Sequence, residues 1–147
     1  MSSIMDHIQG QNRHQMLFMC WEQMIAKESF VRIIDAFVDG LDLETFGFSY
    51  FQLNKEGRPP FHPSDLLKLY IYGYQKKLRS CRALEHACRD SIEVIWLLKG
   101  CRPSYRTIAK FRKDNALAFR KVFRSFLRLL KGWELIEGKH IAIDSFK

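Results

Sequence analysis

The chain has 147 residues, the length of one domain or of one domain with part of another. Its 47% hydrophobic and 14% aromatic residues are enough for a packed core and exclude a wholly disordered protein. No apolar run reaches the ~18–20 residues that span a bilayer, and the first residues lack the basic and apolar parts of a signal peptide. We therefore expect a cytoplasmic protein with no membrane partner.

The net charge of +8 is distributed unevenly along the chain. Residues 1–60 carry 5 Lys/Arg and 8 Asp/Glu, a sum of −3, whereas residues 61–147 carry 19 Lys/Arg and 8 Asp/Glu, a sum of +11. A basic segment of this kind favours a polyanionic partner, most often nucleic acid. The alternative is a solvated basic surface that binds nothing.

The four cysteines, Cys20, Cys81, Cys88 and Cys101, include no C-x-x-C pair. In a cytoplasmic protein they are expected to be reduced and partly buried. A zinc site built from Cys81, His86, Cys88 and Cys101 is an alternative, although its spacing matches no common structural zinc pattern.

The first third of the chain predicts a tail, an apolar patch and a helix. Residues 1–15 are polar and without pattern, which predicts a disordered tail, and residues 17–25 form a Met-rich patch around Trp21. Apolar positions 30, 33, 34, 37, 38 and 41 then have helical spacing, which predicts an amphipathic helix ending near Gly40. Because its polar face is acidic, we expect this helix to pack as scaffold and not to contact DNA.

Residues 47–62 form a linker with Gly57 and a Pro-Pro pair. The following helix is predicted to begin with His62 as its N-cap and Pro63 in its first turn, and to extend to about Leu78. Its side chains are apolar around most of the circumference, so we expect it at the centre of the core.

Four more helices are predicted between residues 80 and 132. Ser80 and Ser104 are the expected N-caps of two of them, and Gly100 is the expected left-handed residue after another. The predicted ranges are 81–89, 92–98, 104–115 and 116–131, and the last helix is expected to end at Gly132. The sequence therefore predicts an all-α, compact multi-helix domain.

The short helices on either side of Gly100 and the helix after Ser104 have the layout of a helix-turn-helix unit, whose second helix enters the major groove N-terminus first. Ile108 and Phe111 would anchor that helix to the core. The candidate DNA-binding side chains are Arg102, Tyr105, Arg106, Lys110 and Lys113. An arginine can bond a guanine edge with two hydrogen bonds, which discriminates by ~1–3 kcal/mol. The alternative is that such a layout occurs in any compact all-α domain.

The last predicted helix carries two parallel stripes. The apolar stripe consists of Phe119, Val122, Phe123, Phe126, Leu127 and Leu130, and the cationic stripe of Arg120, Arg124, Arg128 and Lys131. Like charges four residues apart repel by roughly 0.2–0.5 kcal/mol per pair, and no acid lies between residues 115 and 133 to relieve them. Contact with DNA phosphates would relieve this repulsion; the alternative is a solubilising face.

At the end of the sequence, the alternation of residues 140–143 predicts one orphan β-strand that leads into Asp144. A strand end is a common position for a catalytic or metal-binding carboxylate, but Asp144 has no partner carboxylate in this sequence. No other set of residues has a catalytic spacing such as H-E-x-x-H or a Gly-rich phosphate loop. We therefore expect no catalysis by these residues alone.

Several short segments, in order, resemble the N-terminal helical domain of bacterial insertion-sequence transposases of the DDE type. They are residues 31–32, 34–38 and 41–43, Gly57 to Pro63, Asp65 to Tyr74, Arg79 to Glu85, Trp96 to Leu98, Pro103, and Thr107 to Asn115. Ile141-Ala142-Ile143-Asp144 resembles the first strand of the ribonuclease-H-like catalytic domain that follows in that family. The likeness spans roughly residues 15–147.

The resemblance implies that residues 16–135 form a DNA-binding domain that recognises the element's terminal inverted repeats. It also implies that residues 139–147 begin a catalytic domain, with Asp144 as the first of three acids that hold two divalent ions, such as Mg²⁺. Ser145-Phe146 stand where the family usually has Gly-Thr, and the second and third acids are absent. We expect a front fragment without a cofactor or catalytic activity of its own. An alternative is an interaction module that forms a homo-oligomer, or that represses a full-length transposase by binding it.

Overall fold

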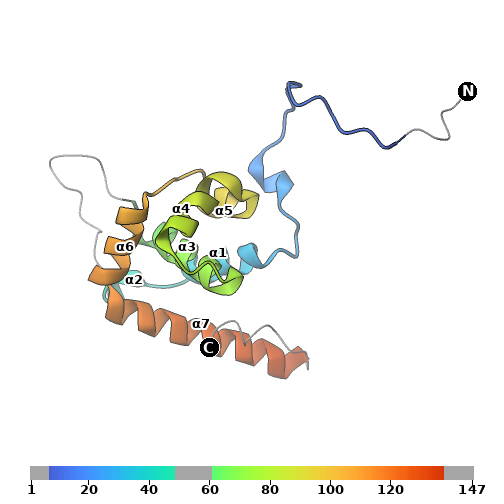
Figure 1. The fold of residues 1–147 in the computed structure, drawn as a ribbon. Coiled ribbons are helices and arrows are strands. Elements are labelled where there is room, and N and C mark those ends of the chain that lie inside the picture. The colour runs from blue at the N-terminus through green and yellow to red at the C-terminus, as the bar shows by residue number, and fades with distance from the viewer. Residues whose placement is uncertain (1–6, 49–60, 138–147) are drawn as a thin grey trace, which may run out of the picture.

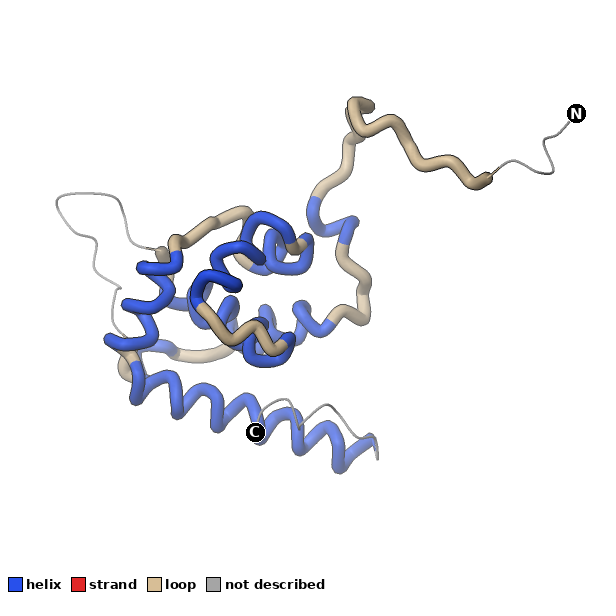
Figure 2. Tube along the Cα trace, viewed as in Figure 1, coloured by secondary structure: helices blue, strands red, loops and turns tan. Residues whose placement is uncertain are grey.

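A computed structural model describes residues 7–48 and 61–137 of the chain. Over these residues all the regular elements are helices, which confirms the predicted all-α class (Figures 1 and 2). The elements are the 3-10 helix η2 (Trp21–Met24) and the α-helices α1 (Phe30–Asp39), α2 (Leu43–Phe46), α3 (Pro63–Lys76), α4 (Cys81–Asp90), α5 (Ile92–Leu97), α6 (Tyr105–Asp114) and α7 (Ala116–Glu137). The predicted strand before Asp144 lies outside the described residues.

Helix α3 is the centre of the core, as its apolar circumference predicts. Residues 66–73 are all buried, and α1, α4, α5 and α6 pack around them. The helix begins as expected: the Nδ1 atom of His62 accepts a hydrogen bond from the Ser64 backbone N–H at 3.1 Å, with Pro63 in the first turn. It ends two residues earlier than predicted, because Lys77 adopts a left-handed conformation (φ 64°).

A buried ion pair joins α1 to α3. The side chain of Lys68 is 1% exposed, and its Nζ atom lies 2.7 Å from the Oδ1 atom of Asp35 and 2.8 Å from that of Asp39. The two carboxylates are partly exposed, at 29% and 57%. The acidic side of α1 is therefore a packing surface for α3, and this role of its acids was not evident from the helical pattern.

Serine side chains begin each of the three middle helices. The Oγ atoms of Ser80, Ser91 and Ser104 accept backbone hydrogen bonds from the first turns of α4, α5 and α6 at 3.0, 3.3 and 3.3 Å. The caps at Ser80 and Ser104 confirm the predicted starts. Helix α4 packs against both α5 and α6, whereas α5 and α6 are not among the closely packed pairs.

Gly100 has two structural reasons to be glycine. Its φ of 82° is left-handed, as predicted. A Cβ atom at this position would also lie 2.7 Å from the Trp21 ring, which therefore packs directly on the glycine backbone. The contact fixes η2 against the loop that follows α5.

Helix α7 continues to Glu137, so the predicted end at Gly132 is wrong. A glycine inside a helix costs only about 1 kcal/mol relative to alanine. Trp133, one residue further on, packs against the core and favours another turn. The short helix α2 was not predicted; Asp42 caps its start and Gly47, at φ 97°, ends it.

Aromatic rings fix α6 and α7 to the body. The Phe111 ring of α6 stacks on Phe48 with centroids 5.7 Å apart, and the Phe119 ring of α7 meets Phe111 edge-on at 5.4 Å. Phe119 also contacts Tyr70 of α3 at 4.9 Å. Figure 1 shows α6 at one end of the bundle and α7 along one side of it. Ile108 and Phe111 are buried, as predicted for the anchors of α6.

Replacing both Asp35 and Asp39 by Asn would leave the buried Lys68 ammonium group without its two ion-pair partners. We expect this double variant to lose about 3–5 kcal/mol of unfolding free energy. Lys68→Met should lose less, because the two remaining carboxylates are partly exposed to water. Urea unfolding followed by circular dichroism makes the comparison, with Lys121→Met, an exposed position on α7, as the control. A double variant as stable as Lys68→Met would show that the ion pair does not act in this way.

The same ion pair predicts a loss of stability at alkaline pH. Burial alone would lower the pKa of Lys68, but its hydrogen bonds to Asp35 and Asp39 and their charges raise the pKa above the ordinary value of 10.5. The stabilisation is therefore complete below pH 10.5 and is lost as the pH rises through the raised pKa. Urea midpoints measured upward from neutral pH should fall more steeply for the wild type than for Lys68→Met. Parallel profiles would contradict the expectation.

Candidate nucleic-acid interface

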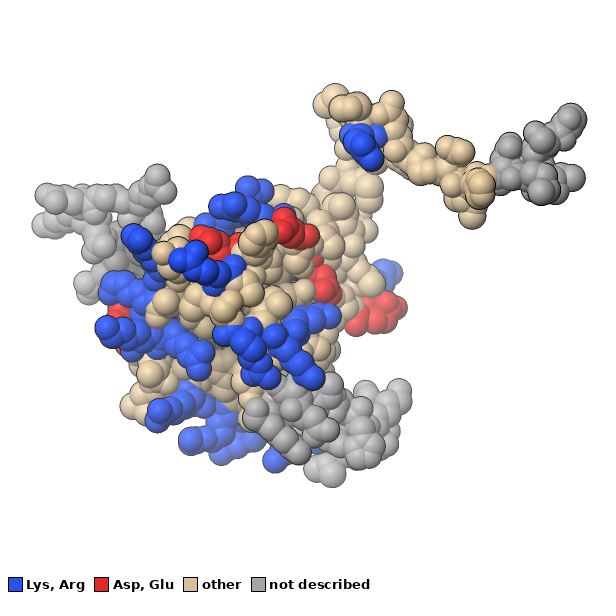
Figure 3. All heavy atoms as spheres, viewed as in Figure 1, with Lys and Arg blue, Asp and Glu red and all other residues tan. Residues whose placement is uncertain are grey.

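Helices α6 and α7 carry a strong excess of positive charge. Residues 105–131 contain nine Lys/Arg and one acid, Asp114. The nine cations, all exposed, are here called the cationic surface: Arg106, Lys110, Arg112, Lys113, Arg120, Lys121, Arg124, Arg128 and Lys131. Figure 3 shows Lys and Arg side chains gathered over α6 and along α7, with few acids beside them.

The predicted cationic stripe of α7 lies in water. Arg120, Arg124, Arg128 and Lys131 are exposed, while Phe119, Val122, Phe126 and Leu130 on the other side of the helix are buried. Over the described ranges no ion pair reaches any of the four cations. Asp35 and Asp39 of α1 form ion pairs with Lys68 and do not neutralise this stripe.

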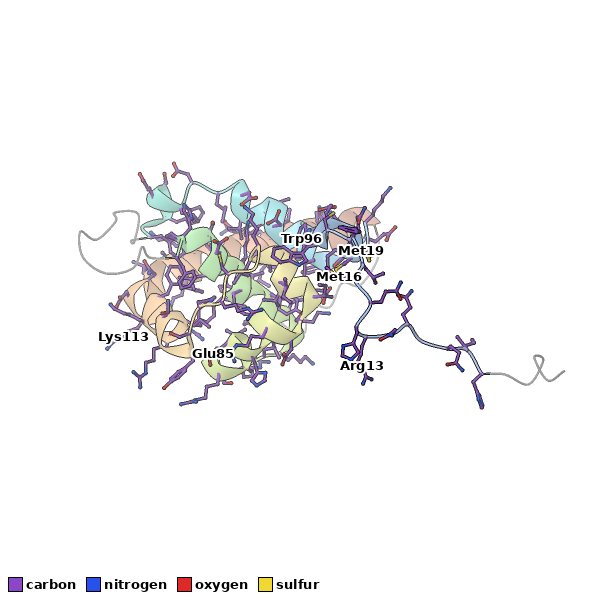
Figure 4. The ribbon with its side chains drawn as sticks, turned by 90° about the horizontal axis from the view of Figure 1, so that it is seen from above. Arg13, Met16, Met19, Glu85, Trp96 and Lys113 are labelled. Atoms are coloured by element: carbon purple, nitrogen blue, oxygen red, sulfur yellow. The ribbon has the colours of Figure 1, made fainter. Side chains whose placement is uncertain are left out.

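The start of α6 is less open than its sequence predicts. The Glu85 carboxylate of α4 accepts a hydrogen bond from the Tyr105 backbone N–H at 3.1 Å, and Figure 4 shows Glu85 on the side of α4 that faces α6. A carboxylate at a helix N-terminus occupies the position in which a phosphate would otherwise be favoured. Side chains, and not the backbone, are therefore the groups of this helix end that can contact an anion.

Tyr105 is half-buried, and two guanidinium groups lie close to its ring. The Arg82 guanidinium lies 4.0 Å from the centroid of the Tyr105 ring, and that of Arg106 lies 5.7 Å from it. The Nε atom of Arg106 also donates a hydrogen bond to the Tyr105 hydroxyl at 3.3 Å. The ring thus positions the two arginines, and Arg106 remains exposed.

The other candidates on and before α6 differ in their surroundings. Arg102 is exposed in the loop between α5 and α6. Lys110 forms an ion pair with Asp114 at 2.6 Å, so part of its charge is already compensated. Lys113 points away from the body near the end of α6 (Figure 4).

Hydrogen bonds of Asn115 connect the end of α6 to the start of α7. Asn115 lies between the two helices and is 4% exposed. Its Nδ2 atom donates a hydrogen bond to the Phe111 carbonyl at 2.9 Å, and its own carbonyl accepts one from the Phe119 N–H at 2.9 Å. The Phe111 and Phe119 rings also meet at the junction, so the two helices pack against each other there.

A hollow with a volume of about 400 Å³ opens where the α3–α4 turn meets α6 and α7. Arginines from three separate elements line it: Arg79, Arg112 and Arg120. Arg79 and Arg112 were not among the residues predicted from the sequence, and neither was Arg82. Arg112 could have been found by counting charge along α6; Arg79 and Arg82 have no local signal, since their neighbours come from other elements.

The segment before α1 exposes large apolar side chains. Met16, Phe18 and Met19 are exposed by 87%, 100% and 54%, and Figure 4 shows Met16 and Met19 on the segment that passes Trp96. The segment is attached through Glu22, which accepts a hydrogen bond from the Trp96 indole at 3.0 Å and forms an ion pair with Arg32. Whether residues 1–15 form a disordered tail stays a prediction.

Among the residues that the structure describes, no three His, Cys, Asp or Glu side chains are grouped to hold a metal ion. Burial raises the pKa of the Cys88 thiol to about 11, which disfavours the thiolate form that zinc requires. Asp144 lies outside these residues, and its role in holding divalent ions stays a prediction. In the same part of the chain, no helix combines the length and the apolar character needed to cross a membrane.

Comparison with curated proteins and with solved structures gives no significant match. One family model, described as a transposase domain, matches residues 19–114, which are 96 of the 147 residues. The match runs from η2 to the end of α6 and leaves α7 outside it. The chain therefore belongs to the transposase domain family DUF772.

Proposed function

We propose that this protein is the DNA-binding domain of a bacterial insertion-sequence transposase, that it recognises the terminal inverted repeats of the element during DNA transposition, and that it lacks catalytic activity alone. The observation that carries the proposal is the cationic surface, nine exposed Lys and Arg side chains with one acid among them. The family match supports a role in transposition.

The α7 stripe is suited to the phosphate backbone. Arg120 and Lys131 lie eleven residues apart, about 16 Å along the helix axis, with the other two cations of the stripe between them. Duplex DNA carries a negative charge every ~1.7 Å of its axis, so a helix lying along it can place each of these side chains near a phosphate. Such contacts position a protein on DNA without reading its sequence.

The α6 helix is suited to contact base edges. Arg106 is exposed in its first turn, and Arg102 is exposed in the loop before it. The hydrogen bond from Arg106 to the Tyr105 hydroxyl limits the motion of the Arg106 side chain, which lowers the entropy that this side chain loses on binding. In a helix-turn-helix arrangement this end of the helix enters the major groove. In this proposal α6 is the second helix of the helix-turn-helix unit. The helices that support it are α4, on which it mainly packs, and α5, which packs on α4.

Catalysis is assigned to parts of a transposase outside this domain. Asp144 remains the predicted first acid of a DDE set, and it would need two further acids to hold Mg²⁺ ions. The described residues offer no carboxylate cluster that fits such ions. In this proposal the domain supplies DNA recognition, and the chemistry comes from a complete catalytic domain.

Arg124→Ala should weaken binding to all duplexes about equally and reduce the slope of log affinity against log salt by about 1, because one phosphate contact is lost. The measurement is fluorescence anisotropy at several salt concentrations, with the repeated ends that flank the gene and an unrelated duplex of equal length. Lys27→Ala, an exposed cation before α1, is the matched control and should change neither value.

Arg106→Ala should act differently in the same assay. It should reduce the preference for the repeated ends over unrelated DNA by ~1–3 kcal/mol, the value of one bidentate base contact. A change of sequence preference in Arg124→Ala instead would contradict this division between the two helices. Wild-type binding that is equal on both DNAs and independent of salt would exclude the proposed function.

A second candidate function is protein interaction, favoured by the exposed apolar side chains of the segment before α1. A cluster of large exposed apolar groups is typical of a protein-binding surface. In this second function the chain forms a homo-oligomer or binds a full-length transposase.

Light scattering tests the second function directly. We expect an average mass that rises with protein concentration in the wild type and stays at the monomer value in a Met16→Ser, Phe18→Ser variant. Leu117→Ser removes an exposed apolar side chain from α7 and is the control; it should behave like the wild type. A wild-type protein that is monomeric at all concentrations would rule out self-association.

A further inference from the structure

The hollow between the α3–α4 turn and helices α6 and α7 combines two chemical features. Its volume of about 400 Å³ lies at the small end of the range for ligand pockets. Arg79, Arg112 and Arg120 contribute guanidinium groups, and no acid is among the lining residues. Tyr70, Tyr74 and Phe123 contribute aromatic rings.

The arginines are available to a ligand. All three are exposed, and over the described residues none of them has an ion pair. Arg79 and Arg112 lie over tyrosine rings of α3, at 5.9 Å from the Tyr74 centroid and 5.8 Å from the Tyr70 centroid. These contacts hold the two guanidinium groups at the edge of the hollow, where their N–H groups can donate to an anion.

The aromatic rings form a continuous wall. The Tyr74 and Phe123 centroids are 5.1 Å apart, and Phe123 stacks on Phe119 at 5.8 Å. Phe119 is buried, whereas Tyr74 and Phe123 are only partly buried and so present ring surface to the hollow. A planar apolar group can pack on this surface while the arginines hold an adjoining negative charge.

A nucleotide combines these two features, a flat base and a phosphate. Bases inside an intact duplex are stacked on one another and cannot reach an aromatic wall, so the base in question must be unpaired or turned out of the helix. We propose that this hollow binds one unpaired nucleotide of DNA, with its base against Tyr74 and Phe123 and its phosphate against Arg79, Arg112 and Arg120.

This inference rests on the proposed DNA-binding function, since the hollow adjoins the cationic surface through Arg112 and Arg120. The cationic surface would hold the duplex on either side of the unpaired nucleotide. The hollow then adds a preference for DNA that is distorted or incompletely paired at one position. Base stacking on aromatic side chains tolerates any base, so this preference should not depend strongly on base identity.

The test uses three duplexes of equal length: one fully paired, one with a single unpaired 2-aminopurine, and one with an abasic bulge at the same position. We expect the wild type to bind the 2-aminopurine duplex between about 5-fold and about 150-fold more tightly than the paired duplex, the range for stacking of one base. The fluorescence of the 2-aminopurine should decrease on binding as the base stacks. The abasic bulge should bind like the paired duplex, because it lacks the base.

Two variants identify the hollow as the source of the preference. Tyr74→Leu should abolish the preference and leave the affinity for the paired duplex unchanged. Arg79→Gln, at an exposed position in the α3–α4 turn, should reduce the preference without disturbing the fold. Arg89→Gln removes the same charge from an exposed position of α4 outside the hollow, and should retain the preference.

The outcomes separate the two proposals. If the wild type binds the paired and the 2-aminopurine duplexes equally well, or if the abasic bulge binds as tightly as the 2-aminopurine duplex, the hollow does not bind a base. If free dAMP binds as tightly as the 2-aminopurine duplex, the site is one for mononucleotides and the assignment to DNA is wrong. If the wild type binds none of the three duplexes, the proposed DNA-binding function itself is excluded.

Discussion

The burial of the apolar sides of α6 and α7 stabilises these helices although the nine cationic side chains on their exposed sides repel one another. Phe111, Phe119 and Phe126 are buried beneath the two helices, and their rings contact one another or those of neighbouring elements. Each fully buried side chain of this kind contributes about 1.5–3 kcal/mol, whereas a pair of like charges on a helix costs only a few tenths of a kcal/mol. The free energy gained by packing therefore outweighs the repulsion. An isolated helix with the same cations would be less stable, because it lacks this packing.

The location of the acids keeps that surface positive. Asp35 and Asp39 are paired with Lys68 between α1 and α3, and Glu22 is paired with Arg32. Glu85 accepts a backbone hydrogen bond at the start of α6. Because these carboxylates already have partners within the fold, they do not neutralise the α7 stripe, and the charge difference between the two parts of the sequence becomes a difference between regions of the surface.

The sequence predicts well those features that depend on neighbouring residues. Helix starts at His62, Ser80 and Ser104 are local, because a cap and the N–H groups it satisfies lie within a few residues. The two stripes of α7 are also local, since helical periodicity alone separates its buried phenylalanines from its exposed arginines.

Features that depend on distant contacts could not be predicted in the same way. Helix α7 continues past Gly132, and Trp133 beyond it packs against the core. The burial of Lys68, the hydrogen bond from Tyr105 to Glu85 and the meeting of Arg79 with Arg120 each join residues from different elements. For the candidate site, the sequence therefore predicts which side chains are cationic and exposed, but not which of them converge. The expectation for Asp144 stays a prediction.

The contact between Trp21 and Gly100 has a consequence for assemblies of this protein. It fixes the root of the exposed N-terminal segment near α5, and Figures 1 and 4 show that segment leaving the body on the side away from α6. A partner that binds the segment would not compete for space with a duplex lying on α6. Two copies linked in this manner could hold two DNA ends at once, and capture of the second end would depend on its effective concentration near the first.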